Sequence, residues 1–205
     1  GISIDQVQER RASPIGDAEA REEWASLKAE EQHVINELYA TLGKMIAAFE
    51  EQIPIYPSKW DEWVAATIDD PAAYFDIPTD VIDGFNLFTG KGRCATCHTG
   101  PLYTDMDFHN TGLPALDGMP PDLGRQASVL GLLTDPFNCT GPFSDVDESG
   151  CPELRFMNIS AERTFGTFRT PSLRDVGHRS YLGHAGQIRG IAEMVDHYNQ
   201  APAGP

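Results

Sequence analysis

One short motif constrains this 205-residue chain more than any other feature: Cys94-Ala95-Thr96-Cys97-His98. It follows the pattern Cys-x-x-Cys-His, in which two thiols form thioethers with the vinyl groups of one haem and the adjacent imidazole binds its iron. A redox dithiol or half of a zinc site would also contain Cys-x-x-Cys, but neither explains the following His, and no second Cys-x-x-Cys is present. The motif therefore predicts one covalently bound haem c, attached through Cys94, Cys97 and His98.

A haem iron has a second axial position, and whether it is filled separates an electron relay from a catalyst. The candidate ligands are the Met, His and Tyr side chains beyond the motif: Met106, His109, Met119, Met157, His178, His184, Met194, His197 and Tyr198. Met194 and Tyr198 are four residues apart in a predicted helix, so both project from one face of it. Composition alone does not choose between them.

The two other cysteines, Cys139 and Cys151, lie in a segment rich in Gly, Pro, Asp and Ser. A disulfide between them would close a short ring that little regular structure would otherwise fix. Two free thiols are the alternative, but exposed thiols rarely persist in the oxidising compartment to which a c-type haem points. We therefore predict a Cys139–Cys151 disulfide and a periplasmic or extracellular location.

The formal charge of −16 opposes binding to nucleic acid, whose phosphates are recognised by clusters of Lys and Arg. The acidic surface could steer a basic redox partner, although a solvated surface explains the same charge. No apolar stretch approaches the roughly 20 residues of a membrane span, so none is expected. Residues 1–5 lack the features of an export signal, and we expect any such signal to have been removed or to lie outside this sequence.

Apolar spacing predicts a helix over residues 34–49, and residues 17–31 fit an exposed helix or a mobile arm. Ser58 is expected to cap a short helix that carries Trp60 and Trp63, and Thr79 to cap a helix that leads into the haem motif. Residues 98–124 are irregular, and a last helix is predicted from Ile191 to Tyr198, ended by Ala-Pro-Ala-Gly-Pro.

These elements indicate a mainly α fold: a cytochrome c-like haem domain with long irregular loops and an N-terminal helical extension. We place the extension at residues 1–77, as the possible remnant of a first haem domain, and the haem domain at residues 78–205.

Five segments form an ordered set: Gly84 to Phe88, Cys94 to His98, Phe108-His109-Asn110-Thr111-Gly112, Asp122-Leu123-Gly124-Arg125, and Phe168-Arg169-Thr170-Pro171-Ser172-Leu173-Arg174. Together they resemble the C-terminal haem domain of bacterial di-haem cytochrome c peroxidases, over roughly residues 82–199. His184-Ala185-Gly186 is similar to the family's His-Asp-Gly, with Ala185 in place of the acid, and Glu193 to Asn199 resembles its closing helix.

The resemblance implies an axial ligand. In the peroxidase branch a Met takes the second position on the iron, and here the matching position holds Tyr198. The sequence is in this respect similar to the MauG-like branch, where a Tyr binds the iron and helps to stabilise oxidised states. A phenolate oxygen favours ferric and higher iron, whereas a thioether raises the potential. Tyr198 is thus the expected ligand, with Met194 as the alternative.

The resemblance also implies roles around the haem. Arg125 and Arg174 match positions that pair with haem propionates, and ordinary ion pairs are the alternative for each. His109 and His184 lie in motifs that shape the haem surroundings. Calcium, which the family binds between its two domains through backbone carbonyls, is a candidate second cofactor with no residue assigned.

Complete family members carry two haem domains, whereas this sequence has one motif, and residues 34–53 resemble the helix that closes the first domain. We expect a portion of a peroxidase-type or MauG-like oxidoreductase, whose haem relays electrons to, or shares oxidising equivalents with, a second haem domain or haem-bearing chain. A small cytochrome or a cupredoxin is the expected donor, and no catalytic residue is assigned. The alternatives are a stand-alone single-haem electron carrier and a cytochrome subunit of a larger redox assembly.

Overall fold

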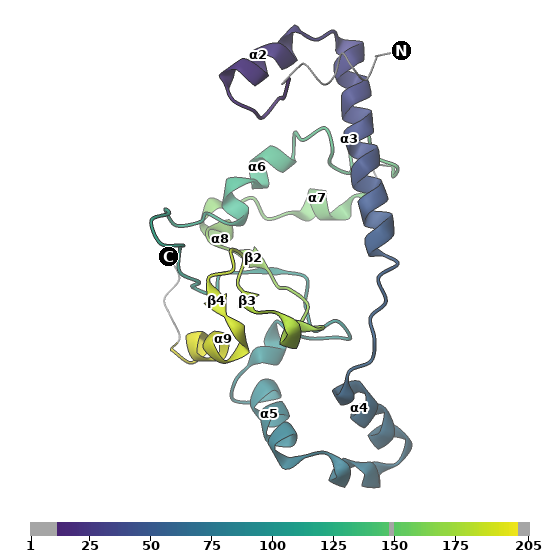
Figure 1. Cartoon of the computed structure of the whole chain (residues 1–205), viewed down its shortest axis with the longest axis vertical. Helices are drawn as coiled ribbons and strands as arrows, with labels where there is room; N and C mark the ends of the chain where they lie inside the picture. Colours follow the sequence, from purple (N-terminus) through teal and green to yellow (C-terminus); the bar gives the residue numbers. More distant parts are fainter. Residues whose placement is uncertain (1–11, 148–149, 201–205) are drawn as a thin grey trace. The chain divides into compact units, whose positions relative to one another are not determined.

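The computed structural model describes residues 12–147 and 150–200, and over these residues the fold is mainly α, as predicted (Figure 1). The α-helices are α2 (Ala18–Ser26), α3 (Ala29–Glu50), α4 (Lys59–Asp69), α5 (Thr79–Thr89), α6 (Val129–Leu132), α7 (Pro152–Phe156), α8 (Ala161–Thr164) and α9 (Gly190–Asn199). The 3-10 helices are η1 (Pro71–Asp76), η2 (Cys94–Thr96), η3 (Arg125–Ala127) and η5 (Val176–His178). The strands are β1 (Phe108–His109), β2 (Phe168–Arg169), β3 (Tyr181–Leu182) and β4 (Ile188–Arg189).

The described residues form two compact units. The first contains residues 12–54 and 141–145, and the second contains residues 55–140 and 146–200. The change of unit at residue 54 falls inside the predicted extension, and the domain boundary at residue 78 stays a prediction. The predictions for residues 1–5 and for the terminal Ala-Pro-Ala-Gly-Pro lie outside the described residues.

In the first unit, both predicted helical segments are helical. Asp17 caps α2 by accepting a hydrogen bond from the Ala20 N–H at 2.9 Å, and α3 begins five residues earlier than predicted, at Ala29. The apolar side chains along α3 are largely exposed: Leu38, Leu42, Met45, Ile46 and Phe49. The segment 141–145 belongs to this unit and is joined to α3 by an ion pair between Lys44 Nζ and Asp145 at 2.6 Å.

Two helices of the second unit precede the haem motif. Ser58 caps α4 as predicted, accepting from the Asp61 N–H while the Asp61 carboxylate accepts from the Ser58 N–H at 2.7 Å. The predicted cap of α5 is wrong by one residue. Thr79 is the first helical residue, and Pro78 occupies the capping position with extended backbone and no side-chain hydrogen bond.

The irregular segments are brought together by short antiparallel pairings. Strand β1 pairs with β2 in the register Phe108 to Arg169, and β3 pairs with β4 (Figure 1). The Arg125 N–H donates to the Thr167 carbonyl at 3.0 Å, which adds the segment 122–125 beside β2. Three of the segments that carry the family resemblance are therefore neighbours in space.

The predicted disulfide between Cys139 and Cys151 is confirmed, with Cα atoms 5.8 Å apart. Cys151 is fully buried, and the neighbouring Asn138 satisfies its buried amide by donating to the Leu132 carbonyl at 2.8 Å. The bridge thereby fixes a segment with little regular structure to the start of α7.

Among residues 12–147 and 150–200, no helix has the length and apolar character needed to cross a membrane.

Candidate haem site

The haem motif forms one tight turn. Residues Cys94 to Thr96 make the 3-10 helix η2, and the Cys94 carbonyl accepts hydrogen bonds from the N–H groups of Cys97 at 3.3 Å and His98 at 2.9 Å. Arg93 enters the turn with a φ of 56°, in the left-handed region. The single turn holds both thiols and the imidazole within one short stretch of backbone, which attachment to one porphyrin requires.

The imidazole of His98 has a defined tautomer. Its Nδ1 lies 2.9 Å from the Tyr103 carbonyl oxygen. A carbonyl only accepts hydrogen bonds, so Nδ1 carries the hydrogen and Nε2 keeps its lone pair for a metal. Metal-binding histidines commonly donate their other ring N–H to such an acceptor.

The thiols of Cys94 and Cys97 are both free and half-buried. Two unpaired thiols next to an imidazole whose Nε2 is available are the donor set that a haem c needs, because the thiols form the thioethers and Nε2 binds the iron. The residues present therefore fit the cofactor that the sequence predicts.

Tyr198, the expected second ligand, lies on α9 and is 46% exposed. Burial is the main cause that raises the pKa of its phenol, a hydrogen bond with the Thr111 side chain opposes it, and the nearby Cys97 and Cys94 raise it further. Once the thioethers form, neither sulfur can carry a negative charge. Tyr198 is thus within electrostatic range of both cysteines, whereas its role as ligand stays a prediction.

Thr111 anchors the end of α9. Its carbonyl accepts a hydrogen bond from His197 Nε2 at 2.9 Å. Met194, the alternative ligand, is half-buried one turn earlier on the same helix. Among the other candidate methionines, Met106 and Met119 are exposed. Met157 lines a cavity together with Arg125 and Phe168.

Arg174 has its guanidinium engaged within the protein. Nη1 donates to the Asp61 carboxylate at 2.6 Å, while Nε and Nη2 donate to the Pro101 carbonyl at 2.8 and 2.6 Å. The ion pair with Asp61 is the alternative that the sequence analysis gave for Arg174. A contact between Arg174 and a haem propionate stays a prediction. Asp61 was not identified from the sequence as a site residue. Its capping position was the only local signal.

Arg125 stacks on an aromatic ring. Its guanidinium carbon lies 3.8 Å from the centroid of the Phe108 ring, within the favourable range for a cation above a π face. Arg125 also lines a cavity of about 280 Å³ together with Met157 and Phe168. No carboxylate partner of this side chain is found among the described residues, and its propionate role stays a prediction.

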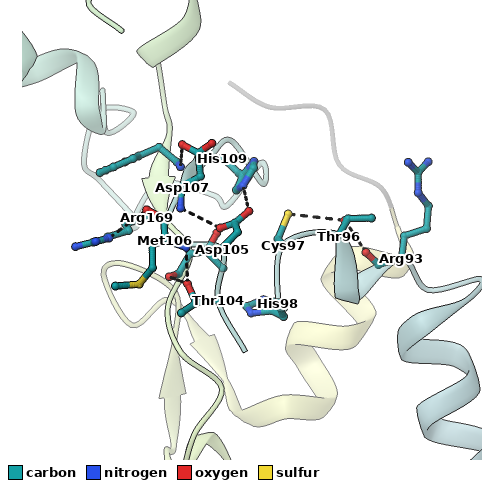
Figure 2. A network of polar contacts seen from close by, with 12 residues as sticks. Arg93, Thr96, Cys97, His98, Thr104, Asp105, Met106, Asp107, His109 and Arg169 are labelled. Atoms are coloured by element: carbon teal, nitrogen blue, oxygen red, sulfur yellow. Dashed lines mark hydrogen bonds and ion pairs between the residues drawn. The ribbon is translucent and has the colours of Figure 1, made fainter. Parts of the chain in front are cut away.

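A carboxylate links the haem motif to β1. Asp105 accepts from His109 Nε2 at 2.7 Å and from the Asp107 N–H at 3.0 Å, and Figure 2 shows this network beside Cys97. Burial acts to raise the pKa of Asp105, but hydrogen bonds from Asp107, His109 and Thr170 outweigh it and lower the pKa. Ligand atoms of Cys97, Asp105 and His109 lie within 4.8 Å of one another. His109 thus borders the cysteine that the motif assigns to a thioether.

His184 packs against Phe168 of β2. Its ring stacks on Phe168 with centroids 3.6 Å apart, and its Nε2 is 3.7 Å from an Asp122 oxygen. Both residues line a cavity of about 300 Å³ that also includes Thr111. The role of His184 in shaping the haem surroundings stays a prediction.

Comparisons with curated proteins find several relatives. Cytochrome-c peroxidase IdrP2 of Denitromonas iodatirespirans is 32% identical over 126 residues, which cover 58% of this chain and 31% of the relative. Methylamine utilization protein MauG of Methylorubrum extorquens is 31% identical over 153 residues, which cover 75% of this chain and 33% of the relative. MauG of Methylophilus methylotrophus is 29% identical over 159 residues, which cover 77% of this chain and 36% of the relative.

These relatives match the MauG-like di-haem cytochrome c peroxidases that the sequence resembles. The predicted resemblance is thereby confirmed, and the names of the relatives imply a c-type haem. This chain spans about a third of the length of the three relatives described above. No protein-family model and no solved structure matches it.

Proposed function

We propose that this chain is the C-terminal haem domain of a di-haem MauG-like oxidoreductase, and that it relays electrons to, or shares oxidising equivalents with, a second haem. The observation that carries the proposal is His98, whose Nδ1 donates to the Tyr103 carbonyl while the free thiols of Cys94 and Cys97 precede it in the same turn. When bound, the haem would supply one-electron redox chemistry.

The residues of this chain would have distinct tasks. Cys94 and Cys97 would attach the cofactor, and His98, through Nε2, and Tyr198 would bind its iron. A phenolate oxygen stabilises ferric and higher oxidation states, which suits a haem that stores oxidising equivalents. With both His98 and Tyr198 bound to the iron, peroxide would react at another site.

The second haem would lie in another domain or chain. Two observations support this part of the proposal: the chain spans about a third of its relatives, and the apolar side chains along α3 are largely exposed among the described residues. A periplasmic location, a small cytochrome or cupredoxin as donor, and calcium as a further cofactor belong to the same proposal. A stand-alone electron carrier is the second candidate, favoured by the single Cys-x-x-Cys-His motif.

The first test is the paramagnetic resonance spectrum of the ferric wild-type protein and of Tyr198→Phe, with haem content measured for both. We expect a six-coordinate signal in the wild type and a changed ligand set in the variant, with the haem still covalently attached. The matched control is Tyr181→Phe, which removes the same hydroxyl from an exposed tyrosine on β3.

An unaltered spectrum in Tyr198→Phe would rule out Tyr198 as the ligand and direct attention to Met194. A high-spin wild-type signal would contradict the relay role and make this haem the candidate catalytic site. Absence of covalent haem would overturn the proposal as a whole.

A further inference from the structure

We propose that Arg174 is a positioning residue for His98, acting through the turn at residues 100–103 whose last carbonyl holds the imidazole Nδ1. The inference rests on the proposed function, because it concerns the haem that His98 would bind. It assigns Arg174 a task other than pairing with a propionate.

Arg174 makes direct contacts with the turn. Its Nε and Nη2 both donate to the Pro101 carbonyl, at 2.8 and 2.6 Å, and its guanidinium carbon lies 4.9 Å from the centre of the Tyr103 ring. A planar guanidinium can donate two hydrogen bonds to the Pro101 carbonyl and at the same time stack on the Tyr103 ring. The ammonium group of a lysine cannot do both. One side chain therefore fixes both ends of the segment from Pro101 to Tyr103.

Ser172 holds the middle of the same turn. Its hydroxyl donates to the Leu102 carbonyl at 2.7 Å and accepts from the Arg174 N–H at 3.1 Å. Tyr103 has a φ of 53°, in the left-handed region that a residue other than glycine seldom adopts. Such a conformation persists where the surroundings enforce it, and Arg174 and Ser172 provide those contacts.

Asp61 keeps Arg174 in place. The pair is 2.6 Å long between Nη1 and Oδ2, and the side chains are only 18% and 26% exposed. Asp61 is itself anchored to the Ser58 N–H at 2.7 Å. All three guanidinium nitrogens thus have partners, and the arginine connects the start of α4 to the turn that orients His98.

The consequence for the iron follows from the His98 hydrogen bond. A carbonyl that accepts from Nδ1 makes the imidazole a more basic ligand, and a more basic ligand favours ferric over ferrous iron. If the turn loosens, the hydrogen bond weakens and the midpoint potential becomes more positive. The conformation of the turn therefore sets the potential.

The test is Arg174→Lys in the haem-loaded protein, with the midpoint potential and the ferric paramagnetic resonance spectrum as readouts and haem content as a check. Lysine keeps the positive charge and loses the fork, so a Coulombic effect on the haem is largely preserved. We expect full haem attachment, shifted g values, and a positive shift corresponding to about tenfold in the reduction equilibrium, or ~59 mV for one electron. Arg179→Lys is the matched control on an exposed arginine, and should behave as wild type.

Ser172→Ala provides a second, uncharged test in case Arg174→Lys does not accumulate as folded protein. It should move the potential in the same direction by a smaller amount. The inference is overturned if haem-loaded Arg174→Lys keeps the wild-type potential and g values, or if it is not obtained and Ser172→Ala is unaltered. A wild-type protein without covalent haem would instead contradict the proposed function.

Discussion

A single carboxylate, that of Asp61, serves both a helix cap and a long-range ion pair. Its Oδ2 oxygen accepts from the Ser58 N–H and from Arg174, a residue 113 positions away. The hydrogen bond from Arg174, together with those from Ser58, holds the pKa of Asp61 well below its ordinary value of 3.8. The same contact raises the pKa of Arg174. The ionised form of Asp61 is therefore the one that stabilises the fold.

This pair predicts a pH-dependent stability. Because the pKa of Asp61 is lower in the folded state, the group contributes its full stabilisation at pH values above its pKa in the unfolded state. This contribution is lost as the pH falls through its pKa in the folded state. Asp61→Asn should lower the free energy of unfolding at pH 7 by about 1–2 kcal/mol, between the values for exposed and buried ion pairs. Urea unfolding from pH 7 downward should show the gap to wild type shrinking below about pH 4.

The matched control is Asp117→Asn, a change of the same charge at an exposed acid. A gap between wild type and Asp61→Asn that stays constant into acid would contradict the assignment.

Residue-level features were predictable from sequence where the signal is local. The haem motif and the Ser58 cap are local patterns, and the axial candidates on α9 follow from helical spacing. The partners Tyr103, Asp61 and Thr111 were missed because each depends on loop conformation or on residues far apart in the chain. The Tyr103 carbonyl in particular has no sequence signal, since every residue has one.

At the scale of elements, helices were predicted well because apolar residues recur at the helical period. Helices α3, α4, α5 and α9 all occur where predicted, with ends displaced by up to five residues. The two-residue strands were not predicted, because a pairing of that length needs no alternating pattern. They exist because loop backbones meet, as at Gly124 and Thr167.

We expect the contact between Gly124 and Thr167 to be sensitive to substitution of Gly124. Its φ is +57°, and a Cβ there would lie 2.5 Å from the Thr167 carbonyl oxygen. Gly124→Ala should lower the free energy of unfolding by at least about 1–3 kcal/mol, because backbone strain and a steric clash add. Gly84→Ala, within α5 and with open space around it, should instead stabilise by about 0.5–1 kcal/mol.

Urea unfolding of both variants, followed by tryptophan fluorescence, measures the two effects with the same chemical change. Equal effects at the two glycines would contradict the structure around Gly124.

At the scale of the whole molecule, the sequence predicted the fold class and the family, but not the two compact units. The loop segment 141–145 belongs with α3, while the cysteines on either side of it belong to the other unit. Composition marked this segment only as a loop. Its assignment depends on contacts such as the ion pair of Asp145 with Lys44, which join distant positions.

We expect the disulfide to contribute a large share of the second unit's stability. Closing a loop with a sequence separation of 12 should contribute about 3 kcal/mol through the unfolded state. The double variant Cys139→Ala/Cys151→Ala should therefore unfold at a lower urea concentration while it keeps its haem, because Cys94 and Cys97 are unchanged. A thiol reductant should destabilise the wild type similarly and leave the double variant unaffected. A wild type that is insensitive to reductant would contradict the prediction.

The acceptor of the His98 hydrogen bond is a main-chain atom. No substitution at position 103 can delete it, since all twenty amino acids supply the same oxygen. Variation in the gene can alter this contact only by bending the backbone, through the neighbours that shape the turn. The hydrogen bond of His98, the proposed iron ligand, therefore depends on the residues that shape the turn, including some that do not touch His98.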